Sequence, residues 1–525
     1  MQEKFYISTA IAYVNSRPHI GFALELAQAD AIARWQRLNG KDVFFLTGTD
    51  EHGAKITRAA EKAGKSPQDF AGENAAVFKK LVEDLNVSSD DFIRTSDEKR
   101  HFPGAVKLWK KLEESGDIYK KNYSGLYCVG HEAFVTQKDL VDGKCADHDA
   151  EPETIEEENY FFRLSKYGQA VKKAVESGEL KIFPESRKNE TVSFINEGLE
   201  DISVSRPSKD ISWGIPVPGD STQTMYVWFE ALANYITALG FGSSNQDNFE
   251  KFWPADIHVI GKDILRFHSI IWPAMLLSAG LPLPKSVFVH GFIHSGGRKM
   301  SKTVGNVIDP VDFVDRHGCD PLRYYLLRDI PTFEDGDFTE ERFVEAYNSD
   351  LANGLGNYIS RISKMIEQYF GGVLERPSDN ELSAVPIKKH SSFFAPNGEG
   401  AKLELVSPPY FIDQVVWPIY RSAFADYKLK QVLDAVWALL GELDAYVQTY
   451  EPFKLIKTDT EKTRAVLWNL SYGALSIAWM LKPFMPDTAE KILDTFGVKS
   501  DSKEEWLKVG VKLDDPLFAR KENVD

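Results

Sequence analysis

Short, nearly continuous apolar runs are the feature that most limits the folds open to this chain. The clearest is Asp42 to Thr47, DVFFLT, and similar runs occur at Lys4 to Thr9, Ile257 to Ile260 and Ser286 to His290. Strands buried on both faces of a parallel sheet have this pattern. Apolar residues at helical spacing follow the first run, from Ile20 to Leu38. The sequence therefore predicts an α/β fold with a doubly wound parallel sheet.

The strand pattern is interrupted in the middle of this sheet and fades in the second half of the chain. From about Ile118 to Trp213 the sequence is irregular and rich in Gly, Asp, Glu and Tyr, which predicts an insertion that splits the sheet. Beyond about Tyr347, helical periodicity predicts an α-helical domain. Within it, the Gly- and Pro-rich stretch Gly371 to Pro409 is interpreted as a long surface loop. The expected helices span Leu355 to Tyr369, Phe424 to Val447 and Val466 to Met485.

Composition excludes several classes of protein. With 43% hydrophobic and 27% charged residues, the 525-residue chain resembles a globular protein with several cores. Three cysteines are too few for a disulfide framework. The N-terminus lacks a signal-peptide pattern and the apolar stretch Ser269 to Leu281 is too short to span a bilayer, so we expect a cytoplasmic protein. The net charge of −16 argues against bulk binding of nucleic acid, though not against a local basic groove.

The first candidate site is the helix start at His19-Ile20-Gly21. A helix N-terminus offers unpaired N–H groups and the positive end of the helix dipole, and His19 adds a side-chain donor. Gly21 has no Cβ, so a flat purine or a phosphate chain can approach the backbone. This pattern predicts an anion-binding site. The alternative is an ordinary helix start with a packed histidine.

The second candidate is the basic loop Gly296 to Thr303, GGRKMSKT, which follows the predicted strand at Ser286 to His290. Its two glycines give mobility and its three cations gather negative charge. A solvated basic turn is the alternative. Because the loop leaves a strand of the same predicted sheet, it and the helix start could face one nucleotide from opposite sides.

The pairing of His-Ile-Gly with Lys-Met-Ser-Lys resembles the two signatures of the class I aminoacyl-tRNA synthetases, in the same order. Within that class, the chain resembles the methionyl-tRNA synthetases from Phe5 to about Pro486. The resemblance implies a Rossmann-type catalytic domain split by a connective insertion, followed by an α-helical bundle that binds the anticodon. The motifs that carry it are Gly48 to Gly53 (GTDEHG), Ile211 to Pro218 (ISWGIPVP), Tyr226 to Glu230 (YVWFE), Gly261 to Ile264 (GKDI) and Asp350 to Asn353 (DLAN).

These implications give expected domain boundaries. The catalytic domain takes residues 1–117 and 214–325, the second part with the Lys-Met-Ser-Lys loop. The connective insertion with its Cys/His knuckle takes 118–213, a stem-contact linker region takes 326–346, and the anticodon-binding domain takes 347–525.

The resemblance implies two chemical steps. The carboxylate of methionine attacks the α-phosphate of ATP to give methionyl-adenylate and pyrophosphate, and the methionyl group then passes to the 3′-terminal adenosine of tRNA. Because the attacking carboxylate is already ionised, the site must supply positioning and charge stabilisation, not a general base. Mg²⁺ is expected on the pyrophosphate. The implied catalytic residues are His19, Gly21, Lys299, Ser301 and Lys302, and the implied ATP-binding residues are His19, Gly21, Gly261, Asp263, Lys299, Met300 and Lys302.

Phe22 departs from the family motif, which ends in a second histidine. Losing one preorganised donor can lower a rate by about 10²- to 10³-fold. We therefore expect a compensating donor or slower activation of methionine. Thr303, which replaces the usual serine, keeps its hydroxyl group.

Selection of methionine requires an apolar pocket with polarizable walls, because thioethers gain from contact with aromatic rings. By resemblance, Asp50 holds the substrate ammonium. Leu232 stands where some members have proline. Without the resemblance, each aromatic residue here is interpreted as core and not as ligand, and the resemblance reverses this for Trp228 and Tyr235. The implied pocket residues are Ile11, Trp228, Leu232, Tyr235, Ile264, Phe267 and His268.

The insertion contains two C-x-x-H pairs, Cys128 with His131 and Cys145 with His148. Four such ligands suit tetrahedral zinc, and a site filled by protein ligands is structural. Family members with a knuckle here usually have cysteine in place of His131. The alternative is a metal-free knuckle with buried thiols.

In the helical domain, Asn357 and Arg361 are four residues apart and so share a helix face. They match the family's anticodon-contacting pair, and Phe453 stands where the family has tryptophan. The implied partners are L-methionine and tRNA(Met), both elongator and initiator, with anticodon CAU. The chain ends soon after Pro486, so a monomer without an appended dimerisation domain is expected.

Two other readings stay open. A class I synthetase for leucine, isoleucine, valine or cysteine would share both signatures, but the first three carry a hydrolytic editing domain larger than this insertion. A cysteine enzyme would place zinc ligands near the first signature, and no cysteine precedes Cys128. A non-catalytic tRNA-binding paralogue is the third candidate, with Phe22 as a sign of decay, although Lys299, Lys302 and Asp50 are retained.

Overall fold

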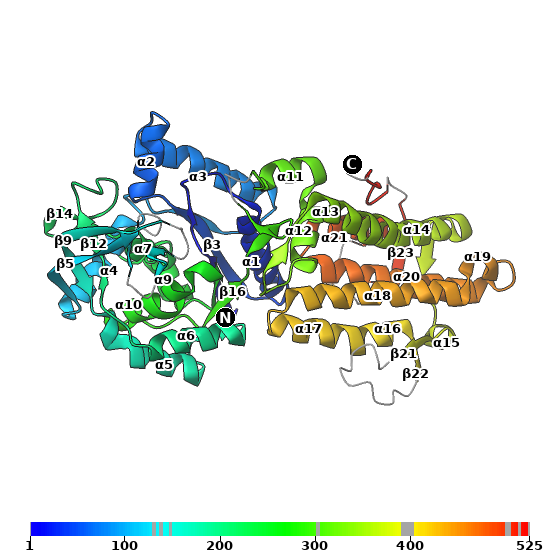
Figure 1. Cartoon of the computed structure of the whole chain (residues 1–525). Coiled ribbons are helices and arrows are strands. Elements are labelled where there is room, and N and C mark those ends of the chain that lie inside the picture. Colours follow the sequence, from blue (N-terminus) through cyan, green and yellow to red (C-terminus); the bar gives the residue numbers. More distant parts are fainter. Residues whose placement is uncertain are drawn as a thin grey trace. The chain divides into compact units, whose positions relative to one another are not determined.

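The computed structural model describes residues 2–128, 133–135, 140–145, 150–300, 305–389, 404–498, 506–512 and 516–522. The chain divides into two compact units (Figure 1). Unit 1 comprises Met1–Phe292 with Ile308–Val311, and unit 2 comprises Ile293–Val307 with Asp312–Asp525.

A parallel sheet forms the centre of unit 1. Its strand order is β10-β16-β15-β1-β3-β2, β4 also pairs with β3, and every one of these pairings is parallel. The strand order reverses beside β1, because β3 lies on one side of it and β15 on the other. The predicted α/β fold with a parallel sheet is confirmed. The strands are β1 Lys4–Thr9, β2 Ala12–Tyr13, β3 Asp42–Asp50, β4 Asp91–Arg94, β10 Lys181–Phe183, β15 Ile257–Gly261 and β16 Ser286–His290.

Helices cover this sheet because its strands are apolar on both faces. Helix α1 packs against β1, β3 and β15, while Tyr6 and Leu46 join a buried cluster with residues of α4 and α10 such as Trp109 and Trp272. Helix α1 ends at Asn39, where Gly40 follows with a φ of 79°. The helices of unit 1 are α1 Ile20–Leu38, α2 Ala54–Lys62, α3 Pro67–Asp84, α4 Phe102–Glu114, α5 Gly168–Ser177, α6 Glu185–Asn196, α7 Val227–Ala231, α8 Asn234–Thr237, α9 Asp247–Phe252 and α10 Trp272–Ser278.

The segment from Lys262 to Ser278, which follows β15, is less regular than a single α-helix. A 3₁₀ turn at Lys262–Ile264 and a π-helical turn at Phe267–Ile271 precede α10. π-helical turns are frequent at functional sites, since they redirect side chains.

The described residues of the predicted insertion contain small antiparallel sheets, one of which continues past Trp213 with β13 and β14. One has the order β11-β9-β5-β6, another β12-β14-β13, and β7 pairs with β8. One strand of this region, β10, does not belong to these antiparallel sheets. It joins the edge of the parallel sheet beside β16, with Ile182 opposite Val287. The strands are β5 Ile118–Cys128, β6 Ala133–Val135, β7 Leu140–Val141, β8 Lys144–Cys145, β9 Glu153–Phe162, β11 Ile202–Ser203, β12 Ser205–Pro207, β13 Pro216–Val217 and β14 Asp220–Met225.

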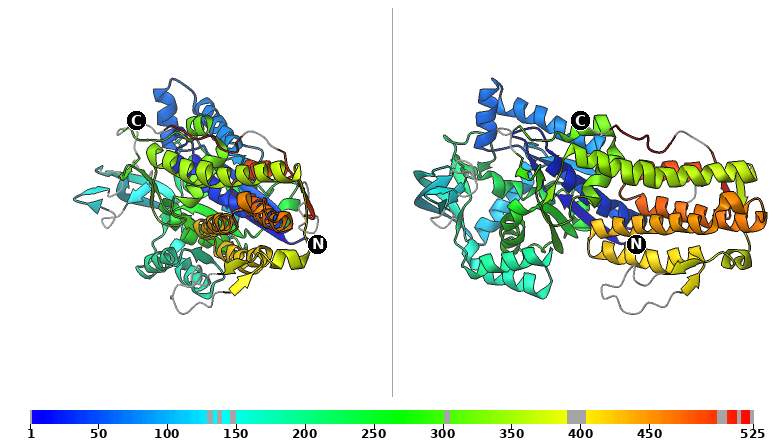
Figure 2. Two further views of the ribbon diagram at one scale, coloured as in Figure 1. Left: turned by 90° about the vertical axis from the view of Figure 1, so that its right-hand side faces the viewer. Right: turned by 45° about the vertical axis from the view of Figure 1, so that its right-hand side comes forward.

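Unit 2 is mainly helical, as predicted. Helix α20 packs against α14, α18 and α21, and α17 packs against α18 (Figures 1 and 2). The helices are α11 Pro310–His317, which begins in unit 1, α12 Cys319–Arg328, α13 Glu340–Ala346, α14 Asn357–Phe370, α15 Asp379–Ser383, α16 Pro408–Phe411, α17 Trp417–Ala425, α18 Leu429–Tyr450, α19 Pro452–Leu455, α20 Thr460–Leu481 and α21 Pro486–Thr495, with π-helical turns at Tyr347–Gly356 and Ile412–Val416. Its strands are β17 Ile293–Ser295, β18 Arg298–Lys299, β19 Gly336–Asp337, β20 Val373–Glu375, β21 Ile387–Lys389, β22 Glu404–Val406 and β23 Lys508–Gly510.

Two expectations for unit 2 are corrected. The helix expected from Phe424 to Val447 is two helices, because the chain turns at Tyr427, whose φ is 54°. The long loop expected from Gly371 to Pro409 contains β20, α15, β21 and β22 in its described parts, and β20 pairs with β23. The Gly and Pro residues here mark breaks between short elements.

No helix in the described ranges is long and apolar enough to cross a membrane.

Candidate active site

The start of helix α1 is organised by His19. Its imidazole Nδ1 accepts a hydrogen bond from the N–H of Gly21 at 3.1 Å, so His19 caps its own helix. A Cβ on Gly21 would lie 3.0 Å from the same ring, so glycine leaves room for the ring to fold back. The expectation of unpaired N–H groups at this point is wrong for Ile20, Gly21 and Phe22. Ile20 donates to the carbonyl of Ile308 and Phe22 to the carbonyl of His19.

The other ring nitrogen of His19, Nε2, is therefore the one that can interact with a ligand. Because Nδ1 acts as an acceptor, the proton of the neutral ring is on Nε2, which can donate. Desolvation by surrounding atoms lowers the pKa of His19; the carboxylate of Asp263 opposes this shift and the imidazole of His290 adds to it. His19 is thus a neutral hydrogen-bond donor near pH 7.

Next to His19, the carboxyl ends of β15 and β16 bring further polar groups together. Gly261 lies opposite His290 in the strand register, and a Cβ on Gly261 would be 2.8 Å from the Asp263 carboxylate. His290 Nε2 lies 3.0 Å from Glu25 Oε2 of α1, and both side chains are buried. Burial lowers the pKa of His290, but the hydrogen bond and charge of Glu25 outweigh it and raise the pKa.

The residues implied for methionine lie together in unit 1. Ile11, Trp228, Leu232, Tyr235, Ile264 and Phe267 all pack in one hydrophobic cluster. The rings of Trp228 and Phe267 stack with centroids 4.7 Å apart. Trp228 also contacts Tyr13, whose strand β2 pairs with the end of β3 at Asp50. The structure therefore brings Trp228 and Phe267 together and links Trp228, through Tyr13, to the strand end that carries Asp50. The other four residues belong to the same large hydrophobic core.

His268, the seventh predicted pocket residue, is joined to Tyr235. The Tyr235 hydroxyl donates to His268 Nε2 at 2.7 Å, and His268 Nδ1–H donates to the carbonyl of Ile264 at 3.0 Å. Burial lowers the pKa of His268 to about 4 and raises that of Tyr235. Both groups are neutral near pH 7, as an apolar substrate side chain requires.

Asp50 ends β3 and is buried, 4% exposed. Its neighbour Glu51 accepts two hydrogen bonds from Arg94, at 2.7 and 2.8 Å, and its carbonyl accepts one from Trp213. These bonds fix the backbone that carries Asp50. At Gly48, two residues earlier, a Cβ would lie 2.1 Å from the carbonyl oxygen of Ile93 on β4, so only glycine lets β3 and β4 pair this closely.

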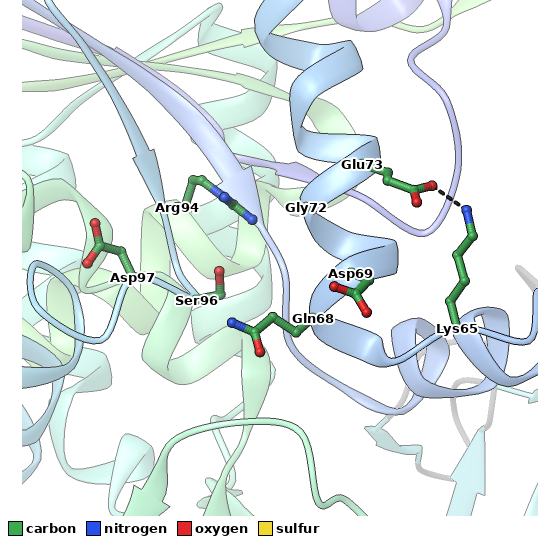
Figure 3. A pocket seen from close by; sticks show the side chains of 8 residues that line it. All are labelled: Lys65, Gln68, Asp69, Gly72, Glu73, Arg94, Ser96 and Asp97. Carbon is green, nitrogen blue, oxygen red and sulfur yellow. Dashed lines mark hydrogen bonds and ion pairs between the residues drawn. The ribbon is translucent and has the colours of Figure 1, made fainter.

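An open pocket of about 600 Å³ is lined in part by Arg94 and Ser96, whose side chains bond to Glu51 (Figure 3). Its charges are mixed, and Lys65 and Glu73 form an ion pair at its rim. It contains none of the predicted substrate residues, so its size alone does not mark a site. The lining residues are Lys65, Gln68, Asp69, Gly72, Glu73, Arg94, Ser96 and Asp97.

The basic loop belongs to unit 2. Gly296 and Gly297, with φ of 61° and 72°, form the tight turn between β17 and β18, and two positive φ values are what a two-residue hairpin needs. Lys299 is exposed and Met300 partly buried. Ser301 and Lys302 lie outside the described residues, as does Thr303. The structure does not relate this loop to His19.

The predicted zinc ligands are described only in part. Cys128 and Cys145 are both 1% exposed and pack in one small cluster with Leu126 and Leu140. His131 and His148 lie outside the described residues. Across the described ranges no group of three or more Cys, His, Asp or Glu side chains could hold a metal ion.

Among the residues implied for the anticodon, Asn357 and Arg361 both belong to α14. Arg361 pairs with Asp444 of α18. Phe453 is 43% exposed on α19, which makes it one of the exposed large apolar side chains. An exposed aromatic ring is available for stacking on a base.

Sequence reasoning missed several buried polar groups of unit 1. These are Glu25 and His290, and a second set in which Glu230 joins His52 and His101. The available signal was a carboxylate inside an apolar run, as in YVWFEALANYI, because a buried carboxylate needs a partner.

Comparisons with known proteins show which family this chain resembles. A family model described as tRNA synthetases class I (M) matches residues 5–146 and 135–363. A methionine–tRNA ligase of Brucella suis is 43% identical over 507 residues, 96% of this chain and 93% of that one. One of Clostridium acetobutylicum is 44% identical over 506 residues, 96% of this chain and 75% of that one. The structure of Mycobacterium tuberculosis methionyl-tRNA synthetase in complex with methionyl-adenylate superposes with a TM-score of 0.89 at 37% identity, covering 99% of this chain and 100% of that one.

A parallel sheet with His-Ile-Gly at the start of the helix after β1 and β2, and a Lys-Met-Ser-Lys loop after the sheet's last strand, defines a class I aminoacyl-tRNA synthetase. The matched family model and the relatives identify the family within this class. The chain belongs to the methionyl-tRNA synthetase family.

Proposed function

We propose that this protein is a methionine–tRNA ligase, which activates L-methionine with ATP and transfers it to the 3′-terminal adenosine of tRNA(Met). The observation that carries the proposal is an aromatic pair near a buried carboxylate. Trp228 stacks on Phe267 and contacts Tyr13, whose strand pairs with the end of β3 at the buried Asp50. This combination suits a thioether side chain and an ammonium group on one small substrate.

In the first step, the residues of this chain bind and orient. Asp50 pairs with the methionine ammonium, and Trp228, Tyr235 and Phe267 enclose the side chain. This holds the carboxylate for in-line attack on the α-phosphate. Ile11, Leu232, Ile264 and His268 complete the pocket.

Charge that builds on the phosphates needs donors. His19 supplies its Nε2–H, and Lys299 and Lys302 supply cations from the loop, with Ser301 as a hydroxyl donor. Gly21, Gly261, Asp263 and Met300 line the nucleotide. Mg²⁺, when bound to ATP, neutralises charge on the departing pyrophosphate.

For tRNA recognition, we assign Asn357, Arg361 and Phe453 to the anticodon CAU of elongator and initiator tRNA(Met). Arg361 would exchange its pairing with Asp444 for contacts to a base. Phe453 would stack on a base, worth about 1 to 3 kcal/mol.

We also propose a structural zinc ion held by Cys128, His131, Cys145 and His148. The two cysteines fit this role, because both are buried in one small cluster. The activity belongs in the cytoplasm, where tRNA is used, and we expect the chain to act as a monomer because unit 1 by itself supplies the methionine and His19 groups.

Methionine-dependent ATP–pyrophosphate exchange tests the proposal, followed by aminoacylation of tRNA(Met). We expect exchange with methionine and none with leucine or cysteine. Exchange with leucine or cysteine would favour another class I synthetase. No exchange with any amino acid, together with binding of tRNA(Met), would favour a non-catalytic tRNA-binding paralogue.

A further inference from the structure

A buried carboxylate, Glu230, lies among the segments that carry the proposed methionine site. It is 2% exposed. Its Oε1 is 2.7 Å from His52 Nδ1 and its Oε2 is 2.7 Å from His101 Nε2. Burial raises the pKa of Glu230, but the two imidazoles outweigh burial and lower it, so the carboxylate is ionised. Both oxygens therefore accept, and both imidazoles donate.

The chain of hydrogen bonds continues beyond His101. Its other nitrogen, Nδ1, lies 2.9 Å from the hydroxyl of Thr237. Thr237 therefore extends the network by one more hydrogen bond. On the other side, His52 packs edge-on against the rings of Trp213 and Phe102, at 5.3 and 5.7 Å.

Three of the four members of this network, all except His101, lie two residues after a residue of the proposed methionine site. His52 follows Asp50 by two residues, Glu230 follows Trp228 by two, and Thr237 follows Tyr235 by two. None of the three is itself in the predicted pocket. The network therefore joins the ammonium-binding segment to both aromatic walls.

The walls need such a connection because their helices are short. Helix α7 has five residues and α8 has four, and neither has a side-chain cap. Helices of this length are unstable alone, so tertiary contacts must hold them. An ionised carboxylate is a costly way to add stability, because its desolvation offsets what the pairing gains. Unlike an apolar contact, however, the hydrogen bonds of a carboxylate fix the direction in which its partners lie.

We propose that Glu230 is a positioning residue for methionine, which with His52, His101 and Thr237 holds the Trp228 and Tyr235 walls at a set distance from the Asp50 carboxylate. The inference rests on the proposed function, since it assumes that these residues bind methionine. It assigns no contact between Glu230 and the substrate.

Glu230→Gln tests the inference with almost no change in volume. The amide cannot accept from both imidazoles in their present tautomers. We expect the methionine KM in ATP–pyrophosphate exchange to rise at least tenfold while the ATP KM stays within twofold. Isothermal titration calorimetry without ATP should show the same rise in the methionine Kd.

Asp117→Asn is the matched control. Asp117 is a fully buried carboxylate of unit 1 that accepts hydrogen bonds from Lys166 at 2.7 Å and Ser278 at 2.8 Å, and neither partner is in the proposed site. We expect this variant to lose thermal stability with an unchanged methionine KM. Thr237→Val, which keeps the shape and removes the hydroxyl that bonds to His101, should raise the methionine KM by a smaller factor and decides the question if Glu230→Gln does not fold.

The inference is overturned if a folded Glu230→Gln enzyme keeps its methionine KM within twofold, or if the methionine and ATP KM values rise together. An equal rise in methionine KM for Asp117→Asn also overturns it. A wild-type protein that shows neither exchange nor methionine binding overturns the proposed function as well, which separates the two failures.

Discussion

Phe22 occupies the position of the second motif histidine, and its packing gives that residue a defined role. Its ring meets Phe78 of α3 edge-on with centroids 5.2 Å apart, beside Val14, Ile56 and Ala71. The Phe22 side chain thus forms part of a small apolar cluster. We expect that Phe22 exchanges a hydrogen-bond donor of the proposed active site for packing.

Phe22→His should restore the missing donor. We expect the rate constant of ATP–pyrophosphate exchange to rise on the order of tenfold, and the stability to fall by about 2 kcal/mol because the contact with Phe78 is lost. Phe22→Leu is the control, since it loses the ring without gaining a donor, and its exchange rate should not rise. A Phe22→His enzyme no faster than wild type would mean that another group already supplies this donor.

The buried, neutral state of His268 predicts how the stability of the folded protein depends on pH in the acid range. Its pKa is about 4 in the folded protein and 6.5 without burial, so between these values the unfolded chain binds more protons. Stability from this group therefore falls as pH drops from 6.5 towards 4, by about 3 kcal/mol in total, and is constant above that window. Urea unfolding across pH should show a shallower acid loss for His268→Gln. Parallel curves for the two proteins would contradict a neutral, buried His268.

At the residue scale, the sequence led to the pocket aromatics and to His19 through motif resemblance. It missed Glu230, Glu25 and His290 because a carboxylate or histidine pattern in one sequence does not reveal its partner. His101 and Glu230 are far apart in the sequence, and only the fold places them 2.7 Å apart.

Among the elements, the contact between β3 and β4 is the one least able to accept a larger side chain. Gly48→Ala would press a methyl group against the backbone of Ile93. We expect a loss of about 3 kcal/mol in stability, and a raised methionine KM because Asp50 ends the same strand. Thermal unfolding and exchange kinetics measure both. Gly441→Ala on α18, where a Cβ meets open space, is the control: it should raise the stability by up to about 1 kcal/mol, because alanine favours a helix interior, and leave the methionine KM unchanged.

The next prediction concerns the zinc ion proposed among the small β-sheets of the insertion. We expect about one zinc per purified chain by elemental analysis, and its loss in Cys128→Ser or Cys145→Ser. Cys319→Ser, at the start of α12, should keep the metal. Chelation should lower the melting temperature of the protein before it lowers exchange, since four protein ligands leave no open position for substrate. A protein that purifies without zinc and is unaffected by added zinc would contradict the proposal.

Element type was predictable where the pattern was long and regular. The continuous apolar runs became β1, β3, β15 and β16. The turn at Tyr427 and the short elements within Gly371 to Pro409 were not predictable, because local composition reports breaks in the chain and not the pairings formed across them.

For the whole molecule, we expect a single chain in solution. Light scattering after size exclusion should give a mass near 59.2 kDa, unchanged across protein concentration. A mass near twice this value would contradict the monomer. The division between catalytic and anticodon-binding domains at about residue 347 stays a prediction. The two compact units divide elsewhere, since Lys299 falls in unit 2 although it is predicted to belong to the catalytic domain.

The order of strands in the sheet has a consequence for synthesis. β1 is the first strand to leave the ribosome and can pair with β3 soon afterwards, but its other neighbour, β15, lies 250 residues further along the chain. At 5 to 20 residues per second, one edge of β1 stays unpaired for about ten to fifty seconds. During that time each nascent chain presents a bare apolar strand, and neighbouring ribosomes on one messenger present the same strand to one another.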